Sequence, residues 1–253
     1  MYAHLMTSPA LLSISETMFV GCPAYILRII SYITSVRHSS GPASTNRPSS
    51  PAYDSMPPAD LPSVLAYIDN FNPEGWAREM HMRMPFPPTD VSSPSPSPCG
   101  PLSPLDPPSP STLSSPLYHL ASAYKLCITL YATRVLLRFS SSPQPTPTPF
   151  CFPSHVSSIL SHLTYLYHLP RSSEIFKSTL WLTFIAGAEC RDPQEQQVIL
   201  TLMKQLWDEC LSVNIQAAAR VLEAIWARAR EESERELNWI QFLDSGNFSG
   251  LFI

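Results

Sequence analysis

The stretch 175-IFKSTLWLTFIAGAECRDPQEQQVILTLMKQLW-207 decides how we expect this chain to fold, because it predicts two helices joined by a tight corner. Residues 175–188 place apolar side chains around most of a helix circumference, as in a helix that is buried on nearly every side. Asp192, Pro193 and Glu195 then supply an N-cap, a proline at the first helical position and a carboxylate near the positive helix end. We therefore expect a central buried helix followed directly by a second one.

Apolar periodicity predicts further helices on both sides of this pair, and no strand is signalled. Four of them are expected over residues 24–36, 76–84, 117–139 and 154–168. A fifth begins near Leu61 and is limited by Pro73. A sixth has Asn214 as its N-cap and ends at about residue 234. The aromatic stretch 237–253 is expected to fold back and close the core. The predicted fold class is therefore all-α, an array of antiparallel helices.

Segments rich in proline and serine separate the helical parts of the chain, which has 28 prolines and only 7 glycines. The predicted division is an N-terminal segment with a core helix at 1–37, a Ser/Pro linker at 38–60, a short helical segment at 61–84, a Pro/Ser-rich insert at 85–116 and a helical domain at 117–253. The insert cannot bury enough apolar surface to offset the ordering of its backbone, so we expect it to be disordered.

Charge and cysteine spacing limit the classes of function. A net charge of -4 gives no basic field for nucleic acid. The six cysteines, at 22, 99, 127, 151, 190 and 210, lie too far apart for a zinc or redox motif, which favours a reduced intracellular protein. The start has no basic segment typical of a secretory signal, and the longest uncharged apolar run, 178–188, is shorter than the about 20 residues that cross a bilayer. We expect a soluble protein without a membrane segment.

Neither histidines nor cysteines form a recognisable catalytic or metal-binding pattern. His155, His162 and His168 lie seven and six residues apart, which is not the i, i+4 spacing of a helical zinc site, and we expect them at the surface or rim. The cluster from Glu189 to Asp192 holds a thiol and acids, but no histidine is near in sequence and helix capping already accounts for Asp192. We predict no catalytic, cofactor-binding or metal-binding residue.

Aromatic residues are expected in the core. Trp181, Trp207 and Trp226 recur within helical patterns, and such side chains are usually buried. Acidic and aromatic residues alternate from Glu231 to Leu243, which is also typical of an activation segment, but a core-closing helix is the plainer interpretation.

Several segments resemble a known family. They are GCP at 21–23 before an Ile-rich helix, LYHLASAYKLCITLYATRVLL at 117–137, and the run from LWLTFIAGAECRDP to VLEAIWARAR at 180–230, of which 184–193 and 221–228 are the most specific. Together they closely resemble the C-terminal helical region of fungal zinc binuclear-cluster transcription factors, particularly the acriflavine-sensitivity-control-like group.

The resemblance implies an all-α regulatory domain of a nuclear transcription regulator of fungal type, which is not an enzyme and controls a specialised-metabolism or nutrient-use pathway. It implies protein partners from the transcription machinery, a small inducer as a further ligand, and a homodimer as one assembly. In this family six closely spaced cysteines bind two zinc ions, and this chain has no such spacing. We therefore expect zinc and DNA contact only through a missing or separate N-terminal module. Either the sequence belongs to a longer factor, or the protein acts through partners alone.

Two other classes of protein remain as alternatives. A helical biosynthetic-pathway enzyme would need polar side chains that converge in a pocket. A non-regulatory interaction scaffold would need no link to transcription.

Overall fold

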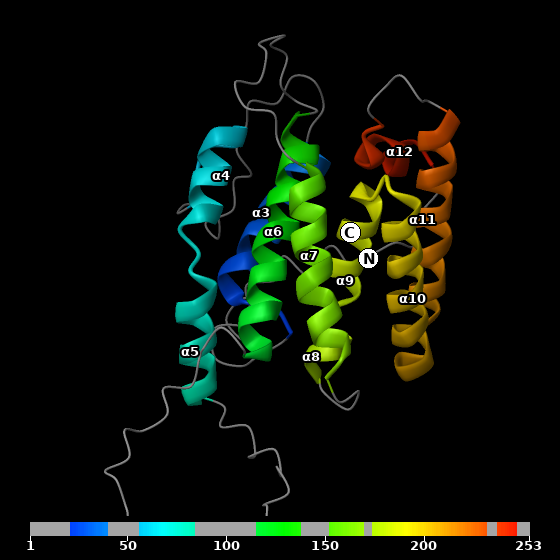
Figure 1. The fold of residues 1–253 in the computed structure, drawn as a ribbon. Coiled ribbons are helices and arrows are strands. Elements are labelled where there is room, and N and C mark those ends of the chain that lie inside the picture. Colours follow the sequence, from blue (N-terminus) through cyan, green and yellow to red (C-terminus); the bar gives the residue numbers. More distant parts are fainter. Residues whose placement is uncertain are drawn as a thin grey trace, which may run out of the picture.

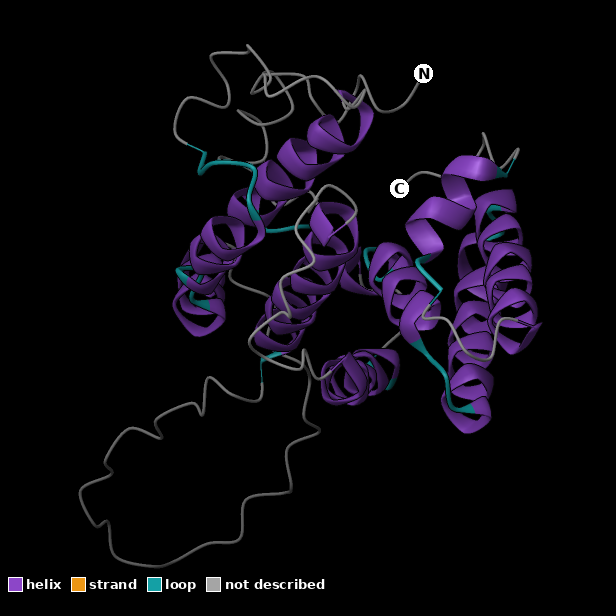
Figure 2. Cartoon of the chain, turned by 90° about the horizontal axis from the view of Figure 1, so that it is seen from above, coloured by secondary structure: helices purple, strands orange, loops and turns teal. Residues whose placement is uncertain are grey.

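The computed structural model describes residues 21–39, 56–83, 115–137, 152–169, 174–231 and 237–246, and all regular secondary structure within these ranges is helical. The predicted all-α class is confirmed. In Figure 2, seen from above, the described residues are drawn as helices and as short loops or turns, and none of them as a strand. The predicted insert at 85–116 lies outside the described residues except for its last two positions, and so does most of the predicted linker at 38–60.

Most of the long helices run roughly upright in Figure 1, and the short α12 lies across the view near the top. The bounds of the helices are α3 Ala24–Ser39, α4 Leu61–Asp69, α5 Pro73–Arg83, α6 Pro116–Leu137, α7 Phe152–Tyr167, α8 Glu174–Lys177, α9 Leu180–Glu189, α10 Pro193–Cys210, α11 Val213–Glu231 and α12 Trp239–Ser245.

The centre of the array is α6, and not the helix predicted there. It packs against α3, α4 and α5 on one side and against α7, α8, α9 and α12 on the other, whereas α9 packs mainly against α6, α7, α10 and α11 (Figure 1). Residues 182–189 of α9 are all buried, as the sequence predicts. The long α6 has the larger role because its 22 residues can contact both halves of the array.

Among the described helices, α6 is also the one long and apolar enough to cross a membrane, and 72% of its most apolar window is buried inside the protein. Burial to that extent is the environment of a core helix, in which apolar side chains contact neighbouring helices.

The predicted helix over 175–188 is interrupted. It forms α8 and α9, separated by a turn at Ser178 and Thr179. The Thr179 hydroxyl donates to the Phe176 carbonyl oxygen at 2.6 Å, and Tyr124 of α6 donates its hydroxyl to the Ser178 carbonyl oxygen at 3.0 Å. These bonds satisfy the backbone in a non-helical conformation, so tertiary contacts override the helical pattern. Gly21, at φ +86°, packs so closely on this turn that a Cβ would collide with Ser178.

Helix α10 begins as predicted, and α11 does not. Asp192 is the N-cap of α10 and accepts the Gln194 backbone N–H at 3.1 Å, with Pro193 at the first helical position. Asn214, the predicted N-cap of α11, instead lies inside the first turn, because α11 begins at Val213. The corner between the two helices is made by Leu211, whose left-handed backbone, at φ 49°, lets its N–H bond the Trp207 carbonyl oxygen at 2.9 Å.

Gly187 brings three helices close together. A Cβ at this position would lie 2.7 Å from Leu222 Cδ1 of α11 and 2.9 Å from Ile199 Cγ2 of α10. Trp226 of α11 donates its indole N–H to the Gly187 carbonyl oxygen at 2.8 Å. The absence of a side chain at Gly187 therefore lets α9, α10 and α11 pack at short range.

Candidate functional site

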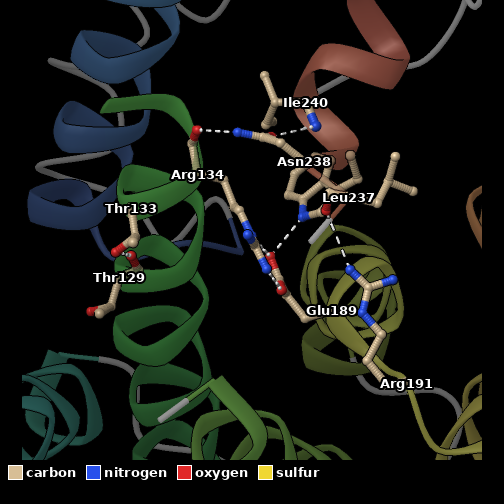
Figure 3. A network of polar contacts seen from close by, with 9 residues as sticks. Thr129, Thr133, Arg134, Glu189, Arg191, Leu237, Asn238 and Ile240 are labelled. Carbon is tan, nitrogen blue, oxygen red and sulfur yellow. Dashed lines mark hydrogen bonds and ion pairs between the residues drawn. The ribbon is translucent and has the colours of Figure 1, made fainter. Parts of the chain in front are cut away.

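The most highly organised polar site in the described part of the chain is a buried ion pair between α6 and α9. Arg134 donates from Nε to Glu189 Oε1 and from Nη2 to Glu189 Oε2, each at 2.7 Å. Arg134 is 5% exposed and Glu189 is 4% exposed. Figure 3 shows the two side chains pointing toward one another from their separate helices. A parallel two-bond pairing of this kind fixes orientation as well as distance.

The start of α12 completes the same network. Trp239 donates its indole N–H to Glu189 Oε1 at 2.7 Å, and Asn238 donates its side-chain amide to the Arg134 carbonyl oxygen at 3.0 Å. The side-chain oxygen of Asn238 accepts the Ile240 backbone N–H at 3.0 Å and caps α12 (Figure 3). We call Arg134, Glu189, Asn238 and Trp239 the α12 lock.

Two further contacts support the lock. Arg191 donates to the Leu237 carbonyl oxygen at 3.3 Å, which holds the residue that precedes the N-cap of α12. The guanidinium of Arg134 lies 4.3 Å from the ring centre of Phe152 in α7, a cation–π contact. The lock thus joins α6, α7, α9 and α12 through one buried cation.

The polar groups of the α12 lock bind one another and stabilise the fold. Glu189 Oε1 already accepts two hydrogen bonds and Oε2 accepts one, so the carboxylate is occupied by the chain itself. Two buried charges are costly to desolvate, and they persist where each satisfies the other. Of the predicted polar cluster at 189–192, Glu189 therefore supports the fold and Asp192 caps α10.

A second polar feature joins α6 to α7. His119 and His162 place their Nδ1 atoms 2.9 Å apart, and we call them the histidine pair. Tyr165 stacks on His119 with ring centres 3.8 Å apart, and Tyr118 lies edge-on to both imidazoles. Burial and the neighbouring His119 lower the pKa of His162.

The three histidines predicted at the surface or rim have different environments. His168 is exposed, whereas His155 and His162 are half-buried. His162 was not predicted to have a histidine partner, because His119 lies 43 residues earlier in the sequence and only the packing of α6 on α7 brings it near.

The described cysteines are not arranged for metal binding or nucleophilic chemistry. Cys22, Cys127 and Cys190 are buried as free thiols, and burial raises the pKa of each. A thiolate is the reactive and metal-binding form, so these positions disfavour both. Within the described ranges, no group of three or more His, Cys, Asp or Glu side chains could hold a metal ion.

The tryptophans of the described helices are buried or half-buried and pack in the core. Trp226 and Trp239 are buried, while Trp181 and Trp207 are half-buried. Together with Ile240 and Leu243, Trp239 buries one side of α12, which is the core-closing arrangement expected of this stretch. Its acidic part, residues 232–236, lies outside the described ranges.

A comparison with protein families adds to this description. The family model described as "Fungal specific transcription factor domain" matches residues 2–253. No curated protein and no solved structure matches the chain.

Proposed function

Because the chain belongs to the family of the fungal-specific transcription factor domain, as its resemblance to such factors predicts, we propose that it is the regulatory part of a fungal transcription regulator. The observation that carries this proposal is the extent of the match, since residues 2–253 include every described helix. A fungal transcription regulator is the function of the family in general. Beyond that general function, we propose the regulatory role, the partners and the pathway.

The proposed mechanism is that the helical array contacts proteins of the transcription machinery, while a separate module contacts DNA. The net charge of -4 supports this division, because phosphate binding depends on clustered Lys and Arg. Zinc would belong to that separate module, since the cysteines here are widely spaced. Leu211 and Val213, 69% and 72% exposed at the α10–α11 corner, offer apolar surface for such a contact.

The proposed role is non-enzymatic and nuclear. The lock supports the first point, because its buried carboxylate is saturated by Arg134 and Trp239 and is occupied in holding α12. A small inducer bound between helices, and a homodimer, are further parts of the proposal. In each case a ligand or partner would act by favouring one arrangement of the array over another.

The proposal is tested by fusing residues 1–253 to an unrelated DNA-binding domain in a fungal reporter strain. We expect reporter expression to rise or fall relative to the DNA-binding domain alone. Glu189→Gln, which breaks the α12 lock, should remove this effect, while Asp208→Asn at an exposed ion pair should preserve it.

Chromatin immunoprecipitation must show that each fusion occupies the promoter. Unchanged expression from a promoter-bound wild-type fusion would refute a regulatory role. A fluorescent fusion of the whole chain tests the nuclear location separately: nuclear accumulation is expected, and exclusion from the nucleus under all growth conditions favours a scaffold elsewhere in the cell.

A further inference from the structure

The histidine pair joins α6 to α7 by a hydrogen bond between two like side chains. His119 Nδ1 and His162 Nδ1 are 2.9 Å apart, and both residues are half-buried, so that protons reach them from solvent. In such a bond one Nδ1 carries the proton and the other accepts it. We propose that the histidine pair is an acid-sensitive contact, which holds α6 against α7 at neutral pH and breaks when both imidazoles are protonated.

The pair can take up one proton without losing this bond. One imidazolium still donates its Nδ1–H to the neutral partner, and such a charge-assisted bond is stronger than a neutral one. A second proton, on the accepting Nδ1, leaves two donors and two positive charges facing each other where the bond was. Only the two Nδ1 atoms enter these steps, so they do not depend on what His119 meets through its other atoms. The contact therefore tolerates one imidazolium and excludes two, and the rings titrate as a coupled pair.

His162 is the member of the pair whose protonation the fold opposes. Burial, and then the charge of His119, lower the pKa of His162. Tyr165 stacks on His119 with ring centres 3.8 Å apart, and the face of a tyrosine ring attracts a cation. In mild acid we therefore expect the extra proton of the pair on His119, while His162 stays neutral and accepts the bond.

Acidic side chains on the neighbouring elements are engaged elsewhere, so they do not offset a second positive charge at the pair. No described carboxylate forms an ion pair with His162. Glu195 of α10 reaches α7 at Ser157, one helical turn or more before His162. The other described acidic side chains of elements packed against α6 or α7 form ion pairs: Glu74 with Arg78, Glu79 with Arg83, Asp69 with Lys125, Glu189 with Arg134 and Asp244 with Arg37. The remaining ionisable groups on those elements that carry charge in acid are basic: Arg28 and His38 of α3, His81 of α5 and Lys177 of α8.

The direction of the pH effect follows from the lowered pKa of His162. An unfolded histidine titrates near about pH 6.5, so below that pH the unfolded chain binds one proton more than the folded chain. The contribution of the contact to stability is therefore complete above about pH 6.5 and is lost as the pH falls below it. A difference of one proton changes the equilibrium constant for unfolding by up to about tenfold per pH unit.

The loosened helix is also connected to the α12 lock. Helix α7 carries His162 in its second half and begins at Phe152, whose ring centre lies 4.3 Å from the Arg134 guanidinium. Helices α6 and α7 lie side by side in Figure 1. Acid that separates the histidine pair thus weakens the packing of a helix that contacts the lock.

The test is urea unfolding of the whole chain at about pH 7 and about pH 5.5, followed by circular dichroism. His162→Asn removes the titrating ring but keeps an amide oxygen that can accept from His119 Nδ1. Between the two pH values, the unfolding equilibrium constant should rise roughly five- to tenfold more in the parent chain than in His162→Asn. His168→Asn, exposed and just beyond α7, is the matched control and should respond to acid like the parent.

Nuclear magnetic resonance of the parent chain, with isotope-labelled histidine, gives a readout that needs no variant. At neutral pH we expect a scalar coupling between the two Nδ1 nitrogens through their hydrogen bond, and the His162 ring should take up its proton below about pH 6.5. This titration decides the question even if His162→Asn does not fold.

An equal acid response in the parent chain and in folded His162→Asn would overturn the proposal. So would the absence of the nitrogen–nitrogen coupling at neutral pH, because the two rings would then not be bonded. Protonation of His162 in the folded chain at or above about pH 6.5 would also overturn it, since the fold would then not oppose the second charge.

Discussion

Replacing Glu189 by glutamine removes one charge from the α12 lock while preserving the size of the side chain. Arg134 would remain buried and cationic, with a neutral amide in place of its two-bond carboxylate partner. Breaking a buried ion pair from one side costs about 3–5 kcal/mol. Trp239 would still find an amide oxygen, so its hydrogen bond need not be lost. We therefore expect the free energy of unfolding to fall by about 3–5 kcal/mol.

The matched control removes both charges. In Arg134→Met with Glu189→Leu, replacing a buried pair by apolar residues is neutral or stabilising by about 1–4 kcal/mol. The Trp239 indole N–H then loses its acceptor, which costs about 1–3 kcal/mol. The two effects oppose each other, so the double variant should lie within roughly 2 kcal/mol of the wild type.

The assay is urea unfolding followed by circular dichroism, with the free energy extrapolated linearly to water. Asp208→Asn serves as a surface control, because Lys204 and Asp208 are exposed and such pairs contribute about 0.3–0.5 kcal/mol. The reasoning is refuted if Glu189→Gln costs less than about 1 kcal/mol, or if the double variant is as unstable as the single one.

Two further substitutions and one alkylation experiment test the packing. Gly187→Ala should lower the free energy of unfolding by up to about 2 kcal/mol in the same assay, because the new methyl group collides with Leu222 and Ile199 and this cost offsets the about 1 kcal/mol that alanine gains in helix propensity. Leu211→Gly should raise the Tm, since glycine relieves a left-handed backbone that costs other residues about 1–2 kcal/mol; an unchanged or lower Tm would contradict this. Cys22 and Cys127 should resist alkylation near pH 8 until urea unfolds the chain, because burial raises the pKa of both thiols; mass spectrometry that finds either one modified in folded protein would show that it is accessible.

Features encoded by neighbouring residues could be predicted from the sequence. The start of α10 follows from Asp192 and Pro193, which satisfy the helix end locally, and the burial of α9 follows from its apolar residues. The division of the predicted helix at Thr179 could not be seen in the same way. It depends on Tyr124, which lies 54 residues from the Ser178 carbonyl group that it binds.

The candidate site was predicted only in part for the same physical reason. Glu189 was identified as belonging to a polar cluster at a helix end, but its partner Arg134 lies 55 residues away inside an apolar helix. In α6 this arginine is surrounded by buried residues, and periodicity alone gives no sign of the charge that compensates it. Hydrophobic periodicity reports which face of a helix is buried, not which polar groups meet there.

The contact between α3 and α12 has a consequence for how the protein is made. Arg37 donates to Asp244 Oδ1 from Nε at 3.1 Å and from Nη2 at 2.7 Å, across 207 residues of sequence. At about 5–20 residues per second, a ribosome needs roughly 10–40 s to add the 207 residues that separate the partners. Within that interval α3, and later α6, leave the ribosome before the helix that contacts them has been made. The nascent chain thus exposes the apolar surface that α12 later buries, which makes it a substrate for chaperones until α12 has left the ribosome and packed.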